Sequence, residues 1–389
     1  MVHQRTSGHR KPFVALILAL GGFVAQTQLT HRVLTVMKYN RPFFVIYVTQ
    51  SVFTASVLVH LVYLAITTKD PITSLCKGLK ITIAKRLRSS KLLQHIRFTC
   101  IRFLLITLTL TAGFTTPTLL WGVGISLSSA SDVTVIWNTN AFFAYVISVT
   151  VLGRQHQHSK FAAVLLATMG VVLVVYGGVE PGNSVLRHRR LPSRSVGDLF
   201  ALLASVLYAG YQLFYDRFIE LPLVSPQVLD DFSSESTPLI EPEELEEYKD
   251  AIYPSPYGLE SSFWTSMIGL CTMSLLWTAF PALQSLGIEH FSLPTDLRTV
   301  LAILGAAMSG ATFMTGTMML LASWGAVTTS VTTLLTTVLV FLTDLLLGAA
   351  ISVWSIIGAA TIAAAFVMLL LADNPPASIL VHATQVSNV

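Results

Sequence analysis

The feature that most limits what this chain can fold into is a series of ten long apolar runs. They cover approximately residues 13–30, 43–67, 101–123, 131–152, 160–178, 198–217, 262–284, 299–321, 325–348 and 353–372. A helix needs about 20 apolar residues to cross the hydrocarbon core of a bilayer. Only 11% of the 389 residues are charged, whereas a soluble domain has about 25%. We therefore expect an all-α membrane protein with ten transmembrane helices, and we exclude a soluble globular enzyme and a disordered chain.

The first run has a second interpretation. Its purely apolar part, Phe13 to Ala25, is short and follows Arg10 and Lys11, as in a secretory signal peptide. The residues that come next are Gln26, Thr27 and Gln28, which do not form a small-residue cleavage site. A retained transmembrane helix is therefore the favoured interpretation.

Basic residues set the expected orientation. The stretch between the second and third runs carries eight of them and a single acid, Asp70; the basic residues are Lys69, Lys77, Lys80, Lys85, Arg86, Arg88, Lys91 and Arg97. Loops rich in Lys and Arg stay in the cytoplasm, so this stretch and both termini are expected there. The arginines between positions 187 and 194 oppose this orientation.

An acidic segment divides the chain. Ten of its 20 acidic residues lie between Asp230 and Glu260, and the surrounding text is rich in Pro, Ser and Glu. Such composition is typical of a flexible, solvated connector. The expected organisation is a first part over 1–217 with a repeat at about 13–178, a cytoplasmic loop over 218–261, four further spans over 262–373 and a tail over 374–389. The second repeat then covers about 198–373, including the sixth span.

The two halves can be aligned with each other. When Gly153 is laid on Gly348, Thr134 falls on Thr329 and Ala163 falls on Gly358. A repeat with an odd number of spans must insert its second copy upside down. The alignment therefore predicts two inverted five-helix repeats, an arrangement found in secondary transporters.

Several short motifs occur in a recognisable order along the apolar runs. They are residues 39–44 (YNRPFF), 129–133 (SASDV), Leu152-Gly153, 170–174 (GVVLV), 197–202 (GDLFAL), 208–211 (YAGY) and 341–344 (FLTD). In this order the chain resembles the drug/metabolite transporter superfamily with its EamA-type repeats. Within it, the chain is similar to the F branch of solute carrier family 35 and to fungal vacuolar proteins of the thiamine-repressible type. It departs from the pattern after Leu152-Gly153, where Arg154 and Gln155 stand in place of the family's usual acid.

The resemblance covers nearly the whole chain from the first span to the tenth. It implies ten helices in two inverted repeats and transport of a small polar metabolite by alternating access across an organelle membrane. It does not name the substrate.

Polar residues inside the spans are the candidates for substrate binding, because each polar group in hydrocarbon needs a partner or water. The fourth span is the richest, and an indole beside two amides suits a polar, planar solute. The alternative is that the amides bond across helices as packing contacts. Tyrosines recur on one face of the sixth span at positions 208, 211 and 215, next to Gln212. The candidate set is Trp137, Asn138, Asn140, Gln50, Tyr211, Thr332 and Thr333.

Asp344 is the candidate for coupling. It is the one acid deep within a span of the second half. A carboxylate there is costly unless it is paired or reached by water. A role in ion coupling and a role in a structural ion pair both stay open.

Two classes of function remain. The first is a secondary active transporter, whose partners are a small-molecule substrate and the lipid bilayer. The second is a transport-inactive scaffold or sensor that acts through its cytoplasmic loop. The sequence has no paired acid and base, metal-ligand spacing, cofactor motif or nucleic-acid signature, so we expect neither an enzyme nor a cofactor. A homodimer is left open.

A sorting signal is predicted in the acidic segment. Glu235, followed by Leu239 and Ile240, matches the acidic dileucine pattern that adaptor proteins read as an extended peptide. Together with the resemblance to vacuolar proteins, the pattern favours the vacuolar or lysosomal membrane, with the Golgi as second choice.

Overall fold

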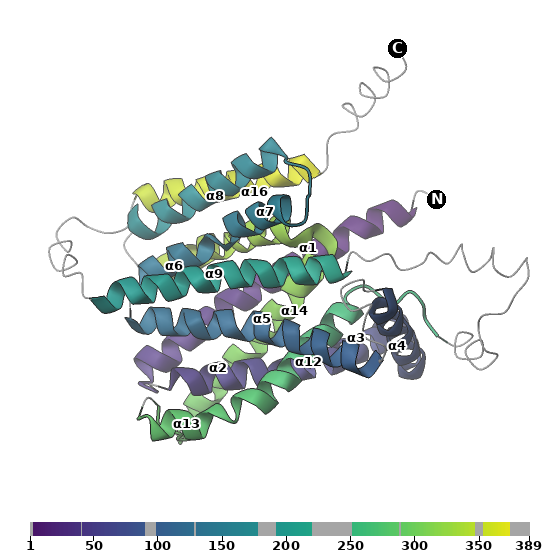
Figure 1. The fold of residues 1–389 in the computed structure, drawn as a ribbon, viewed down its shortest axis with the longest axis horizontal. Helices are drawn as coiled ribbons and strands as arrows, with labels where there is room; N and C mark the ends of the chain where they lie inside the picture. Colours follow the sequence, from purple (N-terminus) through teal and green to yellow (C-terminus); the bar gives the residue numbers. More distant parts are fainter. Residues whose placement is uncertain are drawn as a thin grey trace, which may run out of the picture. The chain divides into compact units, whose positions relative to one another are not determined.

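The computed structural model describes residues 3–39, 41–89, 99–127, 130–177, 192–219, 251–287, 289–346 and 353–373. These residues are almost entirely helical, and no strand occurs among them. The helices in Figure 1 are α1 (His3–His31), α2 (Pro42–Ser51), α3 (Ser56–Thr68), α4 (Ile72–Ser89), α5 (Thr99–Leu127), α6 (Ala130–Asn138), α7 (Asn140–Thr150), α8 (His158–Gly177), α9 (Pro192–Ile219), α12 (Leu259–Leu276), α13 (Ala279–Ser285), α14 (Leu297–Thr333), α15 (Leu335–Leu346) and α16 (Val353–Asp373). A π-helical turn, η1 (Arg32–Val36), follows α1, and a 3-10 turn, η2 (Val52–Ala55), joins α2 to α3.

Within the described residues, seven helical segments are long and apolar enough to cross a membrane. They cover Pro12–Leu34, Pro42–Thr68, Thr99–Gly124, Val133–Thr150, Ser195–Phe218, Leu259–Ser285 and Leu297–Val340. Two shorter apolar helices cover His158–Val174 and Ile356–Leu371. Large apolar side chains such as Ile17, Ile66 and Leu346 are exposed, as expected of surfaces in lipid. The prediction of an all-α, multi-pass membrane protein is confirmed.

The described helices form two compact units. Unit 1 comprises Met1–Ala112 and Phe214–Ser323, and unit 2 comprises Gly113–Leu213 and Trp324–Val389. Each unit therefore takes segments from both sides of the acidic loop. The predicted repeats follow the order of the sequence and stay a prediction.

In unit 1, α12 runs antiparallel to α2 and α3. Tyr47 contacts Met273, whereas His60 contacts Ser262, so the order of contacts along α12 is reversed. Between them the Ser266 hydroxyl accepts from the Val57 N–H at 2.8 Å and donates to the Phe53 carbonyl at 3.2 Å. These two backbone groups would bond each other in a continuous α-helix. Insertion of the hydroxyl into that ladder accounts for the 3-10 turn η2.

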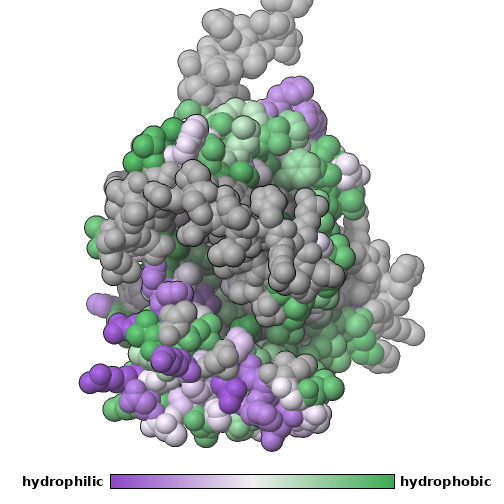
Figure 2. All heavy atoms as spheres, turned by 90° about the vertical axis from the view of Figure 1, so that its left-hand side faces the viewer, coloured by the Kyte–Doolittle hydropathy of each residue, from purple (hydrophilic) through white to green (hydrophobic). Residues whose placement is uncertain are grey.

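The YNRPFF motif lies at the start of α2, where Pro42 occupies the first turn. The buried Glu289 carboxylate accepts from the Phe43 and Phe44 N–H groups at 2.9 and 3.0 Å, which caps the helix with a negative charge. The Tyr39 hydroxyl donates to the Ser292 carbonyl at 2.6 Å, and partial burial raises the pKa of Tyr39. Figure 2 shows hydrophilic side chains gathered over this end of unit 1, where α2 and α13 lie, beside apolar flanks. The motif therefore fixes how the chain enters its second span.

Helix α4 lies outside the membrane-spanning segments and packs on residues 251–260, at the end of the acidic segment. The Ile252 N–H donates to the Ser74 carbonyl at 3.2 Å, and the Lys85 ammonium lies 4.3 Å from the centre of the Tyr253 ring. Burial lowers the pKa of Lys85. The buried Arg86 pairs with Glu260, at the start of α12. This basic helix is thus a docked part of unit 1.

In unit 2, α8 and α16 pack antiparallel through glycines. A Cβ atom built on Gly170 would lie 2.7 Å from the Ile362 side chain, and one built on Gly358 would lie 2.6 Å from the Val174 nitrogen. Ala163, Ala167 and Ala365 are fully buried in the same interface. Small residues on both helices therefore allow their backbones to approach closely.

Candidate functional site

The fourth predicted span is interrupted in unit 2. Helix α6 ends at Asn138 and α7 begins at Asn140, with Thr139 between them. The Thr139 N–H donates to the Ile136 carbonyl at 3.1 Å, a 3-10 bond, and its hydroxyl donates to the same carbonyl at 2.5 Å. Both bonds tighten the turn and end the regular α-helical ladder.

The ninth predicted span is interrupted in the same way. Helix α14 ends at Thr333 and α15 begins at Leu335, and the Leu334 N–H donates to the Val331 carbonyl at 3.1 Å. The alignment that lays Gly153 on Gly348 also lays Thr139 on Leu334 and Ile136 on Val331. The two breaks and their 3-10 bonds therefore fall at matching positions of the two halves.

The two broken helices cross near their breaks. The Asn138 amide donates to the Thr337 hydroxyl at 3.4 Å, so the side chains beside the two interruptions meet. Towards their other ends, Ser148 of α7 and Val327 of α14 line one pocket. As residue numbers rise along one helix they fall along the other, which makes the pair antiparallel.

Helix α9 contacts both breaks. Its Ser205 hydroxyl lies 3.0 Å from the Thr139 hydroxyl, and its Gln212 carbonyl accepts from the Ser330 hydroxyl at 2.6 Å. Ser205, Gln212 and Ser330 are fully buried. A chain of polar contacts therefore connects the two interruptions inside unit 2.

Three buried polar atoms near the breaks have no hydrogen-bond partner among the residues that the structure describes. They are Asn140 Oδ1, Thr329 Oγ1 and Gln212 Nε2, which lies near the Tyr208 hydroxyl without the geometry of a regular hydrogen bond. A buried polar atom without a partner costs about 1–3 kcal/mol. Such atoms are rare in native proteins, and each calls for a water molecule or a ligand. They offer one acceptor, one donor and one hydroxyl, which are the hydrogen-bonding groups needed to bind a polar solute.

Aromatic rings lie beside this polar group. The Trp137 and Tyr208 ring centres are 4.9 Å apart, and the Tyr208 and Tyr211 rings stack at 5.8 Å with 27° between their planes. Trp121 and Phe114 extend the row on either side. Rings arranged in this way present flat faces and edges suited to a planar or cationic group.

The structure brings some of the predicted site residues together and gives others a local role. Trp137, Asn138 and Tyr211 belong to the region where α6, α9 and α15 meet. The Asn140 amide donates to the Trp137 carbonyl at 2.9 Å and keeps its own Oδ1 unpartnered within the described residues. Thr332 and Thr333 donate at 2.7 Å to the carbonyls of Thr328 and Ser330 on their own helix. Their hydroxyls therefore satisfy backbone groups, as small polar side chains in helices commonly do.

The remaining predicted residues are not assembled with this region. Gln50 is buried in unit 1, in α2. Asp344 lies on α15, and its coupling role stays a prediction. Glu235, Leu239 and Ile240 fall outside the described residues.

Sequence reasoning missed Ser205, Gln212 and Ser330 as members of the site. The recurrence of Tyr208, Tyr211 and Gln212 along α9 was a usable signal for one of them. Ser205 and Ser330 had none, because single serines are common in transmembrane helices.

Comparison with known proteins bears on the fold alone. No family model matches the chain, and no curated protein matches it. A solved structure described as "Crystal structure of protein" has a TM-score of 0.55 and 14% sequence identity over 91% of this chain and 96% of that chain. The fold is therefore similar to one in a crystal structure over nearly its whole length.

Proposed function

We propose that this protein is a secondary active transporter of a small polar metabolite, of the drug/metabolite transporter type with EamA-like repeats. The observation that carries the proposal is the pair of interrupted helices crossing in unit 2, with buried polar atoms beside the breaks that have no hydrogen-bond partner among the described residues. Interrupted transmembrane helices form the substrate sites of many secondary transporters, because their freed backbone and polar side chains bind solute at the middle of the membrane.

The helices support a count of ten spans. The apolar segment Leu297–Val340 has 44 residues and bends at Gly325, whose φ of 79° is not helical. A helix rises about 1.5 Å per residue, so this segment is long enough for two spans of a ~30 Å core. The shorter helices His158–Val174 and Ile356–Leu371 supply the fifth and tenth spans.

Helix directions support inverted repeats. The proposed repeat mates are spans two and seven, four and nine, and five and ten. In the structure α12 runs against α2 and α3, the two broken helices run against each other, and α16 runs against α8. Opposite directions are what two copies of one repeat, inserted upside down relative to each other, require.

The substrate that fits is small, polar and planar. The row of rings around Trp137, Tyr208 and Tyr211 provides stacking surfaces, and Gln212 and Asn140 provide a donor and an acceptor. An amide can both donate and accept, and the rings beside it offer flat faces, so the site suits a planar heterocycle better than an aliphatic chain.

Uptake by reconstituted vesicles tests the proposal. We expect the purified protein to accumulate at least one member of a panel of labelled vitamins, nucleotides and amines. Gln212→Leu removes an amide that no other described residue replaces, so its uptake should fall about tenfold or more at unchanged protein amount. The matched control is Gln284→Leu, on an exposed position of α13, which should transport like the parent.

The scaffold or sensor is the second candidate. Silence across the whole panel, with protein correctly folded in the vesicles, would favour it. Equal loss of uptake in Gln212→Leu and Gln284→Leu would contradict the assignment of the site without contradicting transport.

We further propose the vacuolar or lysosomal membrane as the location, with the Golgi as second choice and a sorting adaptor as partner. Leu239→Ala combined with Ile240→Ala removes the two aliphatic side chains that an adaptor pocket would bind. A fluorescent fusion of this double variant should leave the vacuole while its abundance stays the same. A fusion that still reaches the vacuole would show that the motif is not the signal.

A further inference from the structure

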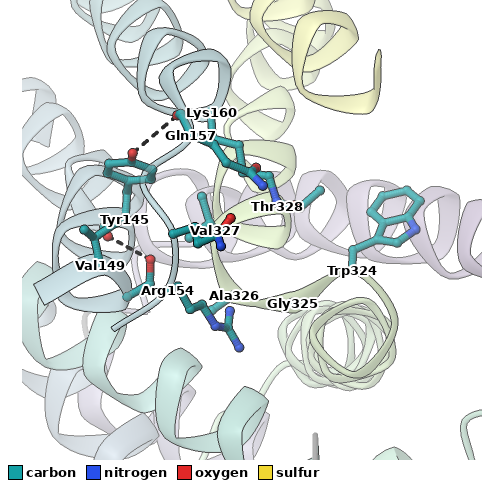
Figure 3. Close-up of a pocket in the computed structure, with 12 residues that line it drawn as sticks. Tyr145, Val149, Arg154, Gln157, Lys160, Trp324, Gly325, Ala326, Val327 and Thr328 are labelled. Atoms are coloured by element: carbon teal, nitrogen blue, oxygen red, sulfur yellow. Dashed lines mark hydrogen bonds between the residues drawn. The ribbon is translucent and has the colours of Figure 1, made fainter. Parts of the chain in front are cut away.

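A pocket lies at the end of the broken helices away from the polar contacts at Asn138. Its volume is about 240 Å³. It is lined by Tyr145, Ser148 and Val149 of α7, by residues of the loop to α8 and its first turn, and by residues 324–328 of α14 (Figure 3). The loop between spans four and five is expected on the cytoplasmic side.

The charged side chains that line the pocket are both basic. Arg154 comes from the loop and Lys160 from the first turn of α8, and no carboxylate occurs among the 12 lining residues. Figure 3 shows Lys160 beside Thr328, whereas the Arg154 side chain runs past Ala326, at the other end of the same turn. Two cations facing one small space attract an anion and repel a cation, more strongly where protein excludes water.

The turn opposite them adds to this field. Gly325 has a φ of 79° and a ψ of 173°, so the helix stops there and starts again at Ala326. The first turn of the new helical segment, from Ala326 to Thr328, lines the pocket. The start of a helix carries a partial positive charge and favours bound anions.

Neutral hydrogen-bonding groups complete the lining. Ser148 and Thr328 are buried hydroxyls, and Gln155 and Gln157 are exposed amides at the rim. The Ser148 hydroxyl already donates to the Tyr145 carbonyl at 2.8 Å, so the amides at the rim are the neutral donors toward an oxyanion, and its charge is left to the two basic residues. The volume is below the roughly 300–1,000 Å³ of pockets that hold whole drug-sized ligands. A small anion, or the anionic group of a larger molecule, is the size that fits.

We infer that this pocket is an oxyanion site, which binds a phosphate or carboxylate group through Arg154 and Lys160. The inference does not depend on transport, because binding is measured on the purified protein without any flux. It also does not depend on the site around Gln212. The anionic group has two sources, a free solute in the cytoplasm or the headgroup of an anionic lipid.

The first arm of the test uses inorganic phosphate and the full-length protein in detergent. Calorimetric titration should show saturable binding to the parent. Arg154→Gln and Lys160→Gln should each weaken it about tenfold, because each removes a charge-assisted hydrogen bond. Arg154→Lys should keep part of the affinity, whereas the matched control Arg217→Gln, on an exposed position of α9, should keep all of it.

The second arm uses the same proteins in nanodiscs of phosphatidylcholine with or without phosphatidic acid. Native mass spectrometry should show retained phosphatidic acid that the Arg154→Gln, Lys160→Gln double variant loses, if the headgroup is the source. Phosphate binding with no selective lipid retention identifies a free solute instead. If the double variant binds both phosphate and phosphatidic acid like the parent, or if the folded parent binds neither, the inference is overturned.

Discussion

Gly358→Ala is expected to destabilise the protein by about 3 kcal/mol, the upper end of the usual cost of overpacking. A Cβ atom at this position would lie 2.6 Å from the Gly170 oxygen and 2.6 Å from the Val174 nitrogen. Both obstacles are backbone atoms, so no side-chain rotation relieves the clash and α8 must move away from α16. Thermal unfolding of the purified protein in detergent, followed by tryptophan fluorescence, measures the loss.

Gly21→Ala is the matched control. Gly21 also lies within an apolar helix, α1, but a Cβ atom built there meets nothing within 4 Å. Alanine favours a helix over glycine by roughly 0.5–1 kcal/mol, so this variant should be unchanged or slightly more stable. Equal and small effects of the two substitutions would show that α8 and α16 are not packed as closely as described.

The helices could be predicted from the sequence because their cause is local. An apolar run of about 20 residues has one stable backbone in lipid, a helix that satisfies its own hydrogen bonds. Each of the ten predicted runs accordingly overlaps a helix in the described residues. Pro117 lies within α5 without ending it, which shows that a single proline is a poor guide to boundaries inside the membrane.

The interruptions at Thr139 and Leu334 could not be predicted, because neither position carries a glycine or proline. Each break needs a backbone carbonyl that bonds outside the regular helical ladder. It also needs a neighbouring helix that offers polar contacts at the irregular turn. Ser205, 66 positions away from Thr139 in the sequence, supplies part of that environment. The break at η2 has the same kind of cause, since the inserted hydroxyl of Ser266 belongs to another helix.

Part of the polar site could be predicted from the sequence, because some of its residue types are rare in transmembrane helices. Trp137 and Asn138 stand out because amides and indoles are unusual in the middle of an apolar run. The threonines at 332 and 333 stand out equally, but their hydroxyls donate to carbonyls of their own helix, as the Asn140 amide also does to Trp137. The Asn138 amide instead donates to Thr337 of the other broken helix. Whether a side chain bonds to its own helix or to a neighbouring one therefore decides which candidates are left for a ligand.

For charged residues outside the spans, the sequence predicts the sign of the charge but not which residue each one pairs with. Arg86 counted as one of eight basic residues that orient the chain, and Glu260 as one of ten acidic residues in the connector. The structure pairs them across 174 positions: Nε lies 2.9 Å from Oε1 and Nη2 lies 3.3 Å from Oε2. The arginine side chain is 6% exposed and the glutamate 13%. Basic residues that count equally towards the net charge therefore differ in how much each contributes to the stability of the fold.

Arg86→Ala is expected to lower the free energy of unfolding by about 3–5 kcal/mol, because it leaves the Glu260 carboxylate buried without its bidentate partner. Glu260→Ala should cost a similar amount for the converse reason. The double variant Arg86→Met, Glu260→Met removes both charges and should recover most of the loss, since two apolar side chains need no partner there.

Lys80→Ala, an exposed position on the same helix α4, is the control and should change stability by less than about 0.5 kcal/mol. Thermal unfolding of the parent and these four variants at low and high salt measures the differences, and a buried pair should resist screening. Single variants no less stable than Lys80→Ala would mean that α4 is not held to α12 by this pair.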